Sequence, residues 1–148
     1  SPWHRLAAVL ALAMISPPAL SASPPAEAVL TVMVAGLAGA EGEVGCALYA
    51  GPDGFPMTPA KAVQQWHPVV AGASTLTCRF PDLAPGTYAV AVSVDRNGNR
   101  VTDTNLFGIP REPWGVSNNV RPGLRAPRFE EAAVTVAETT VITVTVAQ

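Results

Sequence analysis

This sequence has little charge, few aromatic residues and almost no histidine. Of its 148 residues, 14% are charged, 6% are aromatic and two are histidines. The formal net charge is −2, so the dense basic face that binds nucleic acid is missing, and we expect no nucleic-acid partner. No histidine triad for a metal can be assembled, and no Gly-x-Ser-x-Gly segment is present to position a nucleophilic serine. A hydrolase is therefore the least favoured function.

Long hydrophobic runs are also scarce, and the run near the N-terminus is short. Residues 6–15 are apolar, follow a basic start and precede small residues at 21–23, which is typical of a secretory signal peptide. A membrane anchor needs about 20 apolar residues, so we expect no stable anchor after the signal is removed. The sequence predicts a signal peptide over residues 1–23, a linker over 24–28 and a single domain over 29–148. The protein should be periplasmic or secreted.

Only two cysteines are present, Cys46 and Cys78. An even pair in a chain that enters an oxidising compartment predicts one disulfide. The alternative is two buried free thiols on neighbouring strands.

Glycine, proline and β-branched residues are abundant, with 15 prolines and 12 glycines. This composition favours short strands joined by hard turns over long helices. Alternation of apolar and small residues predicts strands in five stretches, the last of them a hairpin: 28–37, 43–50, 74–80, 86–95 and 132–148. We therefore expect an all-β protein, an antiparallel β-sandwich of immunoglobulin-like or transthyretin-like arrangement with about seven strands.

One long irregular region, roughly 95–131, interrupts the strands. It is longer than usual for a loop, and such loops tend to be functional or disordered. It is too apolar for disorder, so we expect it to pack on the sandwich. The apolar residues that support this expectation are Phe107, Ile109, Trp114, Val116 and Phe129.

Oxygen-bearing side chains at alternate positions open this loop and suggest a calcium site. The first, third, fifth, seventh and ninth positions of an EF-hand-type loop would be Asp95, Asn97, Asn99, the Val101 carbonyl and Asp103. The EF-hand pattern then fails, because Arg100 stands where Gly is expected and Leu106 where a bidentate Glu is needed. A different calcium loop, completed by Glu112 or Glu130, is one alternative.

The other alternative is a turn without metal. Asp and Asn side chains accept hydrogen bonds from nearby backbone N–H groups, and Asn97-Gly98 is a favoured turn dipeptide. By the same chemistry, the segments "DTN" and "SNN" in this region could fix the long loop.

Aromatic residues near this loop suggest a binding groove. Tyr49, Phe107 and Trp114, with Phe55, could stack against a small molecule, a glycan or a protein segment. The alternative is a small core under the loop.

Four separated motifs resemble one family of bacterial exported proteins. They are "LYAGPDGFP", "FPDLAPGTYAVAV", "DRNGN" with "DTNLFGIPREPWGVSNN", and "PRFEEAAVTV". Together they resemble the uncharacterised secreted family known as domain of unknown function 2141, which implies export and a small β-sandwich but no established activity. In that family the fourth strand commonly ends in His-Asp-Glu-Asn-Gly-Asn-Gly, whereas this chain has Val94, Arg96 and Arg100 in place of the His, the Glu and the second Gly.

These observations predict an exported, non-catalytic binding or structural accessory module of unknown ligand. The alternative is a calcium-stabilised β-sandwich that uses the loop from Asp95 to Asn105, with calcium as its one candidate cofactor. A hydrolase is a distant third hypothesis.

Overall fold

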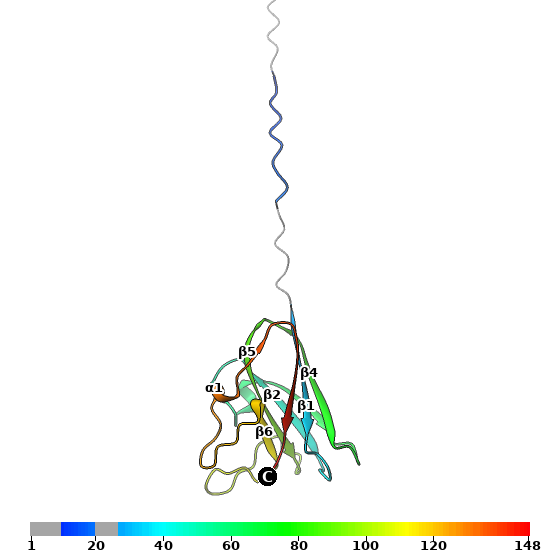
Figure 1. Ribbon diagram of the computed structural model, residues 1–148, viewed down its shortest axis with the longest axis vertical. Helices are drawn as coiled ribbons and strands as arrows, with labels where there is room; N and C mark the ends of the chain where they lie inside the picture. Colours follow the sequence, from blue (N-terminus) through cyan, green and yellow to red (C-terminus); the bar gives the residue numbers. More distant parts are fainter. Residues whose placement is uncertain (1–9, 20–26) are drawn as a thin grey trace, which may run out of the picture.

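The computed structural model describes residues 10–19 and 27–148, and the folded part consists of two β-sheets packed face to face (Figure 1). The first sheet has the order β4 (Thr75–Leu83), β1 (Ala28–Ala35), β8 (Thr139–Thr145). The second has the order β3 (Val63–Pro68), β2 (Glu43–Tyr49), β5 (Gly86–Asp95), β6 (Trp114–Val116), with β7 (Val134–Val136) also paired to β5. Three short helical turns complete the fold: η1 (Pro59–Lys61), η2 (Ser117–Asn119) and α1 (Phe129–Ala132). The predicted β-sandwich is confirmed.

The predicted signal peptide and linker lie mostly outside the described residues. Residues 10–19 are exposed and belong to no helix or strand. Within the two described ranges, no helix is long and apolar enough to cross a membrane.

Alternation along the strands builds the core between the sheets. In β2 and β5, every second residue points inward and is buried, as the sequence predicted, and β1 and β4 supply the opposing layer. Residues of β2 and β5 in this core are Val44, Cys46, Leu48, Val90, Val92 and Val94.

The predicted disulfide is confirmed, and it joins the two sheets. Cys46 lies on β2 and Cys78 on β4, with their Cα atoms 6.6 Å apart. Both side chains are buried in the core. A disulfide in this position is compatible with an oxidising compartment.

The predicted C-terminal hairpin is wrong. β7 pairs with β5 in the second sheet, whereas β8 crosses to the first sheet and runs parallel to β1. Val136 and Val144 therefore reach the same core from opposite sheets. The alternating pattern is the same in both arrangements, because it gives the period of a strand and not the identity of its partner.

A further strand, β3, is not among the stretches that alternation predicts, since the segment around His67 could be a loop or an edge strand. It lies at the edge of the second sheet and buries none of its residues fully, so its sequence lacks the apolar alternation of the other strands. His67 lies on this edge strand, where its Nε2 is 3.2 Å from Oε1 of Gln65.

The long loop packs on the sandwich only in part. Trp114, Val116 and Phe129, the last of these in α1, join a second apolar cluster on the outer face of the second sheet. The same expectation is wrong for Phe107 and Ile109, which are 86% and 57% exposed. The reason is local: Asn105 Oδ1 accepts the backbone N–H groups of both residues, and the resulting turn points their side chains outward.

Candidate functional site

The outer face of the second sheet carries two rows of residues that cross four strands. One row, which we call the tryptophan row, runs Trp66, Gly45, Ser93, Trp114 from β3 to β6. The neighbouring row runs Gln64, Ala47, Ala91, Val116. Adjacent strands lie about 4.8 Å apart, so the two tryptophan positions are separated by roughly 14 Å. Small residues in the middle of both rows leave room above the sheet.

Gly45 is required by the tryptophan beside it. A Cβ at this position would lie 2.5 Å from the Trp66 ring, so the indole lies directly over the glycine backbone. The Arg100 guanidinium lies 5.5 Å from the centre of the Trp66 ring and makes two 3.1 Å hydrogen bonds to the Glu43 carboxylate. Arg100 has φ of 53°, a left-handed conformation that favours glycine. A glycine at this position, which is common in the family that the sequence resembles, would fit this backbone.

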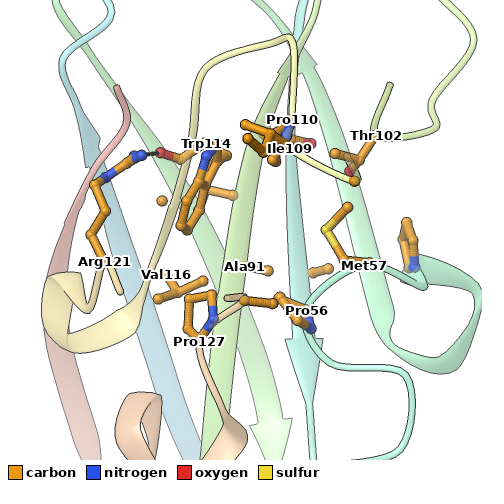
Figure 2. A pocket seen from close by; sticks show the side chains of 18 of the residues that line it. Pro56, Met57, Ala91, Thr102, Ile109, Pro110, Trp114, Val116, Arg121 and Pro127 are labelled. Atoms are coloured by element: carbon orange, nitrogen blue, oxygen red, sulfur yellow. Dashed lines mark hydrogen bonds between the residues drawn. The ribbon is translucent and has the colours of Figure 1, made fainter. Parts of the chain in front are cut away.

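Trp114 is held at the other end of the row by Arg121. The guanidinium stacks 4.0 Å from the indole centre, which is a cation–π contact. Its Nη2 donates one hydrogen bond to the Trp114 carbonyl (Figure 2) and another to the Ala147 carbonyl. Trp114 also exchanges two 3.0 Å backbone hydrogen bonds with Ala147. The C-terminal segment therefore fixes β6 at the edge of the sheet.

Two loops rise beside these rows and enclose a pocket of about 810 Å³ (Figure 2). One loop connects β2 to β3, and the other is the long region on either side of β6. Prolines recur in the walls and restrict the backbone, since each fixes its own φ. They are Pro56, Pro59, Pro110, Pro122 and Pro127. Ligand sites in proteins are commonly of this volume and mostly apolar.

The charged side chains in the pocket are of one sign. The described lining residues include Arg121 and Arg125 but no Asp, Glu or Lys. Arg125 donates hydrogen bonds of 2.9 and 2.7 Å to both carboxylate oxygens of Glu131, which lies outside the lining. This contact, with the Arg128 backbone N–H, lowers the pKa of Glu131 to about 2. Burial lowers the pKa of Arg121, which makes no ion pair with any described residue.

Of the three residues predicted to bind a ligand, the structure places only two in the pocket. Trp114 and Phe107 line the pocket, Trp114 from the sheet and Phe107 from the rim. Tyr49 is 1% exposed and packs edge-to-face on Phe55, with ring centres 5.2 Å apart, outside the lining. Burial raises the pKa of Tyr49 to about 12. Tyr49 is thus a buried residue of a small core, which was the alternative to ligand binding.

Trp66 and the small residues of the two rows were missed in the sequence. The signal that could have found them is the regular placement of Gly, Ala and Ser at the outward positions of β2 and β5. Small outward residues on two paired strands leave a depression on the sheet surface.

The residues predicted to hold calcium form a hydrogen-bonded turn at the exit from β5. The Asp95 carboxylate accepts the backbone N–H groups of Asn97, Gly98 and Arg100 at 3.2, 3.0 and 2.7 Å. Asp103 accepts the side-chain amides of Asn97 and Asn99. Val101 is 58% exposed, and its N–H donates to Asn99 Oδ1.

Glu112 lies against the same turn, whereas Glu130 is an exposed residue of α1. The Glu112 Oε1 accepts the Arg96 N–H at 3.0 Å, while the Glu112 Oε2 is buried and has no hydrogen-bond partner among the described residues. Burial raises the pKa of Glu112, and the nearby Asp103 and Asp95 charges raise it further. In the described part of the chain, however, no three His, Cys, Asp or Glu groups converge as a metal site would require.

Residues 32–144 match the family described as "Uncharacterized protein conserved in bacteria (DUF2141)". The chain belongs to this family. The match runs from β1 into β8 and therefore includes both rows and both loops of the pocket. No curated protein and no solved structure matches the chain significantly. Membership in DUF2141 agrees with the resemblance found in the sequence, and it carries no activity with it.

Proposed function

We propose that this member of DUF2141 is an exported, non-catalytic binding module of the periplasm or the extracellular space, and that it holds a small apolar ligand in the pocket over the second sheet. The observation that carries the proposal is the tryptophan row and its neighbour: two indoles and the small Gly, Ala and Ser residues beside them lie beneath walls that contain five prolines. Apolar, preformed pockets of this size are the usual sites of small ligands. A catalytic role has no comparable support in the lining.

Intrinsic fluorescence offers a direct test. Trp3 lies in the predicted signal peptide, so the processed chain keeps Trp66 and Trp114, and both line the pocket. We expect the neutral dye Nile red to bind the processed protein, to gain fluorescence, and to change the tryptophan emission. A neutral competitor, 1-decanol, should displace it.

A variant that fills the pocket provides the control for location. Ser93 lies in the middle of the tryptophan row, and Ser93→Ile places a bulky, strand-compatible side chain there. The matched variant Thr77→Ile makes a similar change on the outer face of the first sheet. Nile red binding should be lost in the first variant and kept in the second. Equal binding by both variants, or no binding by the wild type, would overturn the proposal in favour of a structural module.

A calcium-stabilised sandwich is the second candidate, and one observation favours it. The unpartnered Glu112 Oε2 is buried beside the Asp95 turn, where a cation would satisfy it. If this candidate is right, millimolar calcium raises the melting temperature of an EDTA-treated sample, and Glu112→Gln removes the rise. A melting temperature that is the same in calcium and in EDTA eliminates it.

A further inference from the structure

The ends of the pocket differ in charge, and this difference bears on which ligand fits. At the β3 end the nearby polar lining group is the neutral Gln64, whose Oε1 accepts the Trp66 indole N–H at 3.1 Å. At the β6 end lies Arg121, a permanent cation. Arg100, which lies over Trp66 at the β3 end, is paired with Glu43 and lies outside the lining. Any ligand that spans the tryptophan row therefore meets an unpaired positive side chain at one end only.

Arg121 and Arg125 are not equivalent in this respect. Arg125 is neutralised by Glu131 through two hydrogen bonds. Arg121 is bound only to the carbonyls of Trp114 and Ala147, both through Nη2. A guanidinium has five N–H donors, and in the described part of the chain the Nε and Nη1 groups of Arg121 have no hydrogen-bond partner. Arg121 thus keeps both its charge and free donors at the pocket edge.

Apolar side chains at the mouth of the pocket describe the rest of the ligand. Phe107 and Leu124 are 86% and 103% exposed, and they belong to the loop segments before and after β6. Isolated apolar side chains on a surface are common, but these lie at the rim of an apolar cavity and extend it outward. Polar side chains are a minority of the lining, which disfavours a ligand that is polar along its whole length, such as a glycan.

From these observations we propose that the pocket selects an apolar organic anion, whose hydrocarbon body lies over Ala47 and Ala91 and whose negative group lies at Arg121. This inference rests on the proposed binding function and adds the charge of the ligand. Arg121 is an exposed residue whose guanidinium is only partly desolvated, so an anion can reach it and would offset that desolvation. The absence of Asp and Glu from the described lining means that a cationic ligand would find no acidic side chain as a counter-charge.

A series of probes with one chain length tests the preference. Decanoate, 1-decanol and decyltrimethylammonium, each below its micelle concentration, compete with Nile red for the processed protein. We expect decanoate to bind about tenfold more tightly than decanol, as a hydrogen bond to a charged group would give, and the cation to bind most weakly. Raising the salt concentration should weaken decanoate binding and leave decanol binding unchanged.

Variants of Arg121 test whether this residue causes the preference for decanoate. Arg121→Gln should reduce decanoate binding to the level of decanol, while Arg121→Lys, which keeps the charge, should retain a preference for decanoate. Arg111→Gln is the matched control, since it removes one exposed positive charge outside the lining. If decanol equals decanoate in the wild type, or if Arg121→Gln leaves the preference intact, the anion inference is wrong and the binding function stands. If none of the three probes binds, both fail.

Discussion

At the scale of single residues, Asp95 shows how a metal-like pattern serves as a turn. Its carboxylate is 1% exposed and accepts three backbone N–H groups from the five residues that follow it. One of these belongs to Arg100, whose left-handed backbone places the N–H toward Oδ2. Alternate Asp and Asn residues are frequent in calcium loops and in such turns for the same reason, because both need closely spaced oxygens.

We predict that Asp95→Ala lowers the free energy of unfolding by about 2 to 3 kcal/mol, because three N–H donors at the strand exit lose their acceptor. Urea unfolding in EDTA measures this without any contribution from calcium. Asp53→Ala is the control: this carboxylate is 83% exposed and makes one 3.6 Å ion pair with Lys61, so the effect should be within about 0.5 kcal/mol. Equal destabilisation by the two variants would refute the role of Asp95.

At the scale of elements, η2 holds together the segments around the second apolar cluster. Ser117 Oγ accepts the Val90 N–H at 3.0 Å and donates to the Ala132 carbonyl, so it links β5 to α1. Asn118 donates to the carbonyls of Glu131 and Ala133, and Asn119 accepts the Thr145 N–H at 2.9 Å. The "SNN" segment thus fixes the long loop by side-chain-to-backbone hydrogen bonds, as its composition suggested.

Replacement of Ser117 tests this link. Ser117 is fully buried, so Ser117→Ala leaves an N–H and a carbonyl without partners and should cost about 2 to 4 kcal/mol of stability. The same change at the exposed Ser74 should cost less than about 0.5 kcal/mol. Thermal and urea unfolding of both variants give the comparison. A Ser117→Ala protein as stable as wild type would show that η2 does not depend on this hydroxyl.

At the scale of the whole molecule, the disulfide closes one chain segment across the two sheets. Cys46 and Cys78 are separated by 32 residues, which include β3 and the loop that forms one wall of the pocket. In the unfolded chain the cross-link therefore restricts the same segment that forms one wall of the pocket in the folded chain.

We expect reduction of this disulfide to lower the free energy of unfolding by about 3 to 4 kcal/mol, through the greater entropy of the open chain. Urea unfolding with and without a phosphine reductant measures the difference, and the double variant Cys46→Ala, Cys78→Ala should reproduce it. Reductant should have no effect on that variant. Identical unfolding midpoints of the oxidised and reduced wild type would contradict the prediction.

Much of the fold could be predicted because strand faces follow from local alternation. Val44, Cys46 and Leu48 on β2, and Val90, Val92 and Val94 on β5, occupy the core as their spacing indicated. The partner of each strand could not be predicted in the same way, and β8 pairs in parallel with β1 instead of folding back on β7. The sequence could not decide between a loop and an edge strand for β3, because an edge strand that is not buried needs no apolar period.

The pocket was harder to foresee than the core. Phe107 and Trp114 were recognised as aromatic residues of the loop, but Trp66 and the small residues beneath it gain their meaning only from the register of four strands. Tyr49, equally aromatic, faces the same side of β2 as Gly45 and yet lies under Phe55 and the second cluster. Sequence distance gives no information on which loop covers which part of a sheet face.

The sequence by itself therefore determined the β-sandwich, the inward and outward faces of its main strands, the family and the cysteine pair, because these depend on local period and composition. Tertiary structure alone decided the parallel pairing of β8 and the pocket between Trp66 and Trp114. Both depend on groups that are far apart in the chain and meet only when strand register and loop packing bring them together.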